Sequence, residues 1–118
     1  METFQFHNSV VWQKAIHLAK ETIILSRKLP KSEELSLRLD LLNSAIAISK
    51  NIAEGSFQKT KPEKKQFYVN SRIALIELDI LMDVSVHLKY LPASELKKIG
   101  PGFLELYKMI SDLIDSGK

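Results

Sequence analysis

Apolar residues recur along most of this chain at intervals of three and four positions, the spacing typical of amphipathic helices. Four such stretches can be traced, over Ser9–Leu29, Leu35–Gly55, Pro62–Lys89 and Ser94–Ile114. The links between them are short, and short links between helices place neighbours antiparallel. The pattern therefore predicts an all-α protein, an antiparallel up-down-up-down four-helix bundle.

Residue types at the ends of these stretches mark helix boundaries. Ser9 is a typical N-cap for the first helix, and Thr60 with Glu63 matches the threonine–glutamate pair of a capping box. Gly55 is expected just beyond the second helix, in the left-handed conformation that closes many helices. A proline inside a helix costs about 3 kcal/mol. The last helix is therefore expected to break near Gly100–Gly102, where a proline stands between two glycines.

The second stretch is apolar over an unusually wide part of its surface. Ala45–Ile48 is a run of apolar residues that point in nearly all directions around a helix. A helix that is apolar all round is normally buried all round, so this one is expected to meet a second surface. We therefore expect a homo-oligomer, unless Ala47 is simply an exposed helix-forming residue. The expected interface residues lie in the first two helices: Trp12, Leu41, Ala45, Ile48 and Ile52.

Three polar side chains stand near the end of the second helix: Ser49, Asn51 and Glu54. If they point inward they must be hydrogen-bonded, because an unpaired buried polar group costs about 1–3 kcal/mol. Glu54 is then a partner for backbone N–H groups or for a basic residue such as Arg72. We interpret this polar cluster as a structural lock that sets helix register, in preference to a functional site.

Composition narrows the classes of protein. At 118 residues, the chain is expected to form a single domain over 1–118. It has no cysteine, which excludes a disulfide framework, a zinc knuckle and a thiol nucleophile. It has no apolar stretch of the roughly 18 residues that a membrane span needs. Met1–Ser9 lacks the features of a signal peptide. We expect a cytoplasmic protein without a membrane partner.

The formal net charge of +3 is unevenly distributed. Ser56–Arg72 carries five basic residues against one glutamate, whereas Ile73–Leu88 carries three acidic residues and no lysine or arginine. Lysines neutralise phosphates without reading bases, and an aromatic ring such as Phe57 or Tyr68 can stack on a base. The candidate nucleic-acid-binding residues are the cations of the basic segment: Lys59, Lys61, Lys64, Lys65 and Arg72. Head-to-tail pairing between copies and an ordinary solvated surface are the alternatives.

No residue pattern indicates catalysis or metal binding. His7, His17 and His87 lie in three separate segments, so no histidine pair is spaced to bind zinc. The carboxylates of the third helix lack the Glu-x-x-His arrangement of di-iron bundles. No phosphate loop, dinucleotide fingerprint or nucleophile elbow occurs. We therefore expect no enzymatic activity, no cofactor and no metal.

Three segments of the chain resemble a known family: Val11–Ala15, Ser49–Gly55 and Phe67–Leu78. The family is that of the 23S rRNA intervening-sequence proteins, four-helix bundles that are sometimes labelled as a ribosomal protein. The accessory variability protein of diversity-generating retroelements is similar to them. The resemblance extends from Asn8 to about Ile114, and its most specific part is the Ser-x-Asn-Ile-Ala-Glu-Gly ending of the second helix.

This resemblance implies an antiparallel bundle that assembles as a ring-like homopentamer, binds RNA or another nucleic acid, and has no known catalysis. The sequence departs from the family pattern at Leu42–Ser44, near which the family usually has a pair of arginines. The expected function is a non-catalytic, homo-oligomeric bundle that binds RNA or DNA. The alternative is a protein-interaction scaffold, for instance an accessory subunit of a reverse transcriptase.

Overall fold

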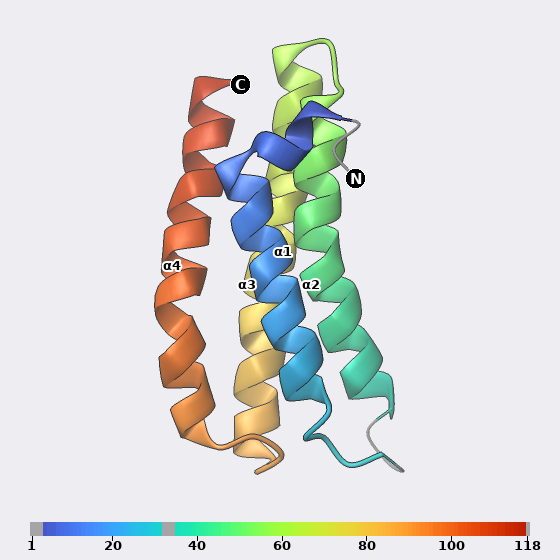
Figure 1. Ribbon diagram of the computed structural model, residues 1–118, viewed down its shortest axis with the longest axis vertical. Coiled ribbons are helices and arrows are strands. Elements are labelled where there is room, and N and C mark those ends of the chain that lie inside the picture. The colour runs from blue at the N-terminus through green and yellow to red at the C-terminus, as the bar shows by residue number, and fades with distance from the viewer. Residues whose placement is uncertain (1–3, 32–34, 118) are drawn as a thin grey trace.

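The computed structural model describes residues 4–31 and 35–117, and the regular elements within them are all helical. In chain order they are the 3-10 helix η1 (Gln5–Asn8) and the α-helices α1 (Val10–Ser26), α2 (Leu35–Ser56), α3 (Lys61–His87) and α4 (Ala93–Ser116). Figure 1 shows that each α-helix runs antiparallel to the next. The prediction of an all-α four-helix bundle is therefore confirmed.

The helices pack in chain order around the bundle axis. α2 packs against both α1 and α3, α3 packs against α4, and α1 closes the bundle through a smaller contact with α4. α1 and α3 therefore lie diagonally opposite each other, with α1 in front of α3 in Figure 1. A face built by α1 and α2 consequently lies on the opposite side of the bundle from a face built by α3 and α4.

All four helices contribute to one hydrophobic core. Its fully buried large apolar side chains are Leu41, Ile48, Leu78, Met82, Leu106 and Ile110. Small hydroxyl side chains fill the tighter places, and each is hydrogen-bonded. Thr22 donates to the Leu18 carbonyl of its own helix at 2.8 Å, whereas Ser71 of α3 donates to the Ile48 carbonyl of α2, also at 2.8 Å. The Ser71 bond therefore ties two helices together inside the core.

Two predicted helix caps are confirmed. The backbone N–H of Trp12 donates to the Ser9 hydroxyl at 3.3 Å, which starts α1. At the start of α3, the Glu63 N–H donates to Thr60 Oγ1 at 3.3 Å, and the Thr60 hydroxyl bonds the Glu63 carboxylate at 2.7 Å. These bonds satisfy backbone donors that a helix leaves without a partner at its first turn. Local sequence is sufficient to place them.

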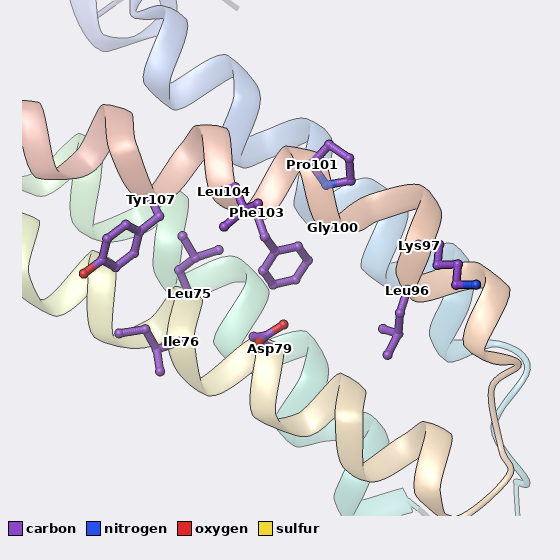
Figure 2. Close-up of a pocket in the computed structure, with 10 residues that line it drawn as sticks. All are labelled: Leu75, Ile76, Asp79, Leu96, Lys97, Gly100, Pro101, Phe103, Leu104 and Tyr107. Atoms are coloured by element: carbon purple, nitrogen blue, oxygen red, sulfur yellow. The ribbon is translucent and has the colours of Figure 1, made fainter.

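The expected break at Gly100–Gly102 is wrong, because α4 continues from Ala93 to Ser116 with Pro101 inside it. Figure 2 shows Pro101 projecting from α4 on the side away from α3. The proline is exposed, so water can reach the carbonyl group that loses its hydrogen bond. Buried side chains before and after it, Ile99 and Phe103, keep one helical phase. Packing of this inner face holds the helix together across the proline.

The expected role of Gly55 is also wrong. Gly55 lies within α2, which continues to Ser56, and its φ angle is not in the left-handed region. Glycine fits this position because there is no room for a side chain: a Cβ atom built there would lie 2.6 Å from Cε1 of Tyr68. The Tyr68 ring packs directly on the backbone of α2, and a side chain on Gly55 would occupy the same volume.

Candidate interaction surfaces

Three of the predicted basic residues form an exposed basic end of the bundle: Lys59, Lys61 and Lys65. Lys59 lies in the link between α2 and α3, and the other two lie one turn apart at the start of α3. Lys61 and Lys65 line a hollow of about 370 Å³ against the end of α4, and the Lys61 side chain lies beside Gly117 there. Three exposed ammonium groups at one end can contact an anionic surface.

The other two predicted basic residues are engaged within the chain. The Lys64 ammonium group donates to the carbonyl of Ser56 at 3.0 Å and to that of Gly55 at 3.4 Å, so it caps the end of α2. Arg72 donates to Ser111 Oγ of α4 at 3.1 Å, and its guanidinium lies 5.6 Å from the centre of the Tyr107 ring. The structure therefore separates Lys64 and Arg72 from the free cations of the basic end.

An aromatic cluster that spacing alone did not reveal joins the N-terminal segment to the link after α2. The rings that take part are Phe4, Phe6, His7, Trp12 and Phe57. Phe4 and Phe57 meet edge-on with ring centres 5.3 Å apart, and both remain at least half exposed. They border a hollow of about 520 Å³ that also includes Phe6 and Ser56. Of the two predicted stacking residues, Phe57 is exposed, whereas Tyr68 is buried and cannot stack on a base.

The predicted polar cluster does not exist as a cluster. Ser49 donates to the Ile46 carbonyl at 3.0 Å, and Asn51 donates to the Ala47 carbonyl at 2.8 Å, so each bonds its own helix. Ser49 and Asn51 are two positions apart and point about 200° apart around the helix, so these two side chains do not meet. Arg72, the expected partner of Glu54, bonds α4 instead. A buried polar contact between helices is made instead by Ser71, which donates from α3 to α2.

The predicted oligomer interface is wrong for four of its five residues. Leu41, Ala45, Ile48 and Ile52 are at most 3% exposed, so they belong to the core of a single chain. Trp12 is half-buried and packs against that core. The central apolar run of α2 divides between two environments because successive side chains point in different directions. Two of its members are buried, whereas Ile46 is 48% exposed.

α3 has apolar residues on two opposite sides. Its outer side, extended by the C-cap residue Leu88, carries an apolar stripe of five residues: Ile73, Ile76, Ile80, Val84 and Leu88. Each is between 41% and 55% exposed, and their spacing of three and four residues keeps them in one row. The core-facing residues of α3, such as Leu78 and Met82, lie on the other side. A contiguous exposed apolar row of this kind marks an interaction surface.

Acidic side chains flank this stripe on both sides. Glu77 lines a hollow against α2, and Asp79 lines a groove against α4. Partial burial raises the pKa of Asp79 above its ordinary value, and the nearby Asp83 carboxylate raises it further. Within residues 4–31 and 35–117, none of the three carboxylates has an ion pair. The outer side of α3 is thus an apolar row between uncompensated negative charges.

The groove between α3 and α4 encloses about 450 Å³ and is lined mainly by apolar side chains. Figure 2 shows Phe103 turned from α4 toward α3, with Leu75 and Ile76 on the facing helix. Leu104 stands at its rim and is 76% exposed, the largest exposed fraction among the large apolar residues of the described chain. The polar residues of the groove do not converge on one point, so its chemistry favours an apolar contact over a small polar ligand.

Within the described residues, no three His, Cys, Asp or Glu side chains are grouped closely enough to hold a metal ion. None of the helices in the described part of the chain combines the length and apolar character that crossing a membrane requires.

Comparison with known proteins gives a family match and a likeness to solved structures. The model of the family described as 23S rRNA-intervening sequence protein matches residues 7–112. No curated protein matches the chain. The chain is similar to a crystal structure of a protein of unknown function from the S23 ribosomal protein family of Bacteroides thetaiotaomicron VPI-5482, with a TM-score of 0.81. The two are 18% identical, over 89% of this chain and 98% of the other. At that identity the likeness shows the fold.

Proposed function

Because the chain belongs to the 23S rRNA-intervening sequence protein family, we propose that it is a non-catalytic, self-associating helical bundle that binds RNA through its basic end. The homopentamer implied by the family resemblance is the stoichiometry we propose. The observation that carries RNA binding is the grouping of free cations with an exposed aromatic ring. Lys59 and Lys61 lie within four residues of Phe57, and Lys65 follows Lys61 by one turn of α3.

This grouping has the chemistry that single-stranded nucleic acid requires. Ammonium groups neutralise phosphates, and base stacking on an aromatic ring contributes about 1–3 kcal/mol per base without demanding a particular base. Phe57 is supported edge-on by Phe4, so an exposed ring is available next to the cations. An RNA with an unpaired loop fits this surface better than a regular duplex, whose bases are stacked inside the helix.

The test is a fluorescence anisotropy titration of a structured RNA with an unpaired loop, at several salt concentrations. In one variant, Lys59, Lys61 and Lys65 are all changed to Glu. The matched control changes three exposed lysines near the other end of the bundle to Glu: Lys31, Lys89 and Lys98. The two variants have the same net charge, so any difference between them reports position.

We expect the basic-end variant to lose at least about tenfold in affinity and to show a salt dependence that is shallower by about two units of slope, since about three phosphate contacts are removed. The control should lose much less affinity and keep most of the wild-type slope. Equal losses in the two variants would contradict binding at the basic end.

A second candidate function, a scaffold for an unlike protein partner, is favoured by the apolar stripe on α3. In the first function another copy of the chain covers that stripe, whereas in the second an unlike protein covers it. If the purified chain stays a single copy in solution and binds no RNA, an unlike protein becomes the better explanation for the exposed isoleucines.

A further inference from the structure

Two opposite faces of the bundle are complementary, and we infer that copies of this chain associate head to tail through them. This inference rests on the proposed self-association and specifies its interface. The acidic face consists of residues from α3 and α4: Ile73, Ile76, Glu77, Asp79, Ile80, Asp83, Val84 and Leu104. The basic face consists of residues from α1 and α2: Ile16, Lys20, Ile23, Arg27, Leu39, Ile46 and Lys50.

The basic face repeats the composition of the acidic face with the opposite charge. On α1 and at its C-cap residue Arg27, the residues Ile16, Lys20, Ile23 and Arg27 follow one another at intervals of four, three and four, so they form one row. The isoleucines are 41% and 37% exposed, and the cations have no ion pair within the described chain. This row is therefore an apolar surface flanked by free positive charge.

The position of this row on α1 follows from the contacts on its other side. Lys14 pairs with Glu105 of α4 at 2.6 Å, and Lys28 pairs with Glu95 of α4 at 3.0 Å. Lys14 and Ile16 are two residues apart and point about 160° apart around α1. Because Lys14 faces α4, the Ile16 row is turned away from α4 and toward α2.

α2 extends the basic face with a row of its own. Leu39, Ile46 and Lys50 are spaced by seven and four residues and are all exposed. Leu39 and Ile46 are each 48% exposed, although both are large and apolar. The α1 row and the α2 row together present four half-exposed aliphatic side chains and three cations, with no carboxylate among the residues of the two rows.

Charge and position together select a second copy as the occupant. The three carboxylates of the acidic face and the three cations of the basic face have no ion pair within the described part of the chain and are opposite in sign. Lys97 also lines the groove on the α4 side and leaves the acidic face net negative, so an acidic face attracts a basic face and repels another acidic face. The two faces lie on opposite sides of the bundle because α1 is diagonal to α3. A contact between different faces of identical chains is heterologous, and it closes into a ring if the rotation between copies allows. The groove beside Phe103 gives the acidic face a hollow for a protruding aliphatic side chain.

Two variants alter one face each without disturbing the fold. Ile80→Lys places an ammonium group three residues from both Glu77 and Asp83, so it forms favourable pairs within its own helix while repelling the basic face. Ile46→Glu places a carboxylate four residues before Lys50, also a favourable pair, while repelling the acidic face. Val10→Glu is the matched control: Val10 is 56% exposed, lies four residues before Lys14, and belongs to neither face.

The experiment is size-exclusion chromatography with light scattering, after circular dichroism has verified that each variant is folded. We expect wild type and Val10→Glu to have a mass of several copies, and Ile80→Lys and Ile46→Glu alone to fall toward the 13.4 kDa of one chain. An equimolar mixture of these two variants should associate again, because the intact basic face of one meets the intact acidic face of the other.

The other outcomes separate this inference from the function on which it rests. If both variants keep the wild-type mass, self-association stands but these faces are not its interface. If only one variant dissociates and the mixture does not recover, like faces pair with each other and the head-to-tail arrangement is wrong. If wild type itself has the mass of one chain, the proposed self-association fails and this inference fails with it.

Discussion

Replacing Gly55 by alanine is the change that most sharply tests how α2 and α3 pack. An added Cβ would lie 2.6 Å from Cε1 and 2.9 Å from Cδ1 of Tyr68, and 3.2 Å from Cβ of Phe67. The Tyr68 ring is 3% exposed, so it has little room to move away. In an unhindered helix this substitution would stabilise by about 1 kcal/mol, because alanine is the better helix former.

Two opposing effects set the size of the change. Overpacking a core costs about 1–3 kcal/mol, and contacts of 2.6 and 2.9 Å to a buried ring place Gly55→Ala in the upper part of that range, at about 2–3 kcal/mol. This cost exceeds the gain in helix propensity of about 1 kcal/mol. We therefore expect Gly55→Ala to lower the free energy of unfolding by about 1–2 kcal/mol. For a chain of this size, that corresponds to a decrease of about 4–8 °C in the melting temperature. The measurement is thermal unfolding followed by circular dichroism, at a fixed protein concentration because association shifts the apparent stability.

Gly102→Ala is the matched control, since Gly102 also lies inside a helix and a Cβ there would meet no atom within 4 Å. It should raise the free energy of unfolding by up to about 1 kcal/mol. A second test places Gly55→Ala in a Tyr68→Leu background, where the clashing ring atoms are absent and the cost should shrink. The reasoning is refuted if Gly55→Ala melts at or above the wild-type temperature, or if its cost is unchanged in the Tyr68→Leu background.

Three further changes test other parts of the structure by urea unfolding. Ser71→Ala removes the hydrogen bond from α3 to α2 and should lower the free energy of unfolding by about 1 kcal/mol. Ser85→Ala removes a 2.8 Å bond within α3 and should lower it by less. Equal decreases for the two variants would contradict this expectation. Lys89 has a φ of 64°, and Lys89→Gly should stabilise by about 1 kcal/mol because glycine adopts this left-handed conformation without strain; no gain would contradict that. A hydrogen bond from Lys28 lowers the pKa of Glu95, so its stabilisation is present above the ordinary carboxyl range and is lost as pH falls through the lowered pKa. Glu95→Gln should therefore differ from wild type at neutral pH and converge with it in acid, and a difference that is independent of pH would contradict this.

Much of the fold could be predicted from the sequence because it depends on local chemistry. Helical spacing of apolar residues identifies four helices, and Ser9 and Thr60 cap two of them through bonds to residues three positions away. The continuous α4 and the role of Gly55 depend instead on tertiary packing. The helical spacing of Ile99 and Phe103 is visible around Pro101, but the sequence does not show that their packing outweighs the cost of the proline. The ring of Tyr68 above Gly55 is not visible in the residues around that glycine.

The interaction surfaces were predicted less well, for a related reason. A wide apolar arc on a helix does not show which part of the arc its own chain covers. In α2 the arc is mostly covered, and Ile46 is left half exposed. The stronger signal was in α3, where Ile73, Ile76 and Ile80 form a second row that the core does not need. That row has helical spacing, so a count of both faces of α3 in the sequence would have found it.

The central claim is that the aliphatic side chains left exposed on α3 are covered by another copy of the chain. Sedimentation velocity of the wild-type protein, over a range of micromolar concentrations, tests it most directly. We expect a principal species whose mass is several times the 13.4 kDa of one chain. A single species with the mass of one chain at every concentration would contradict it.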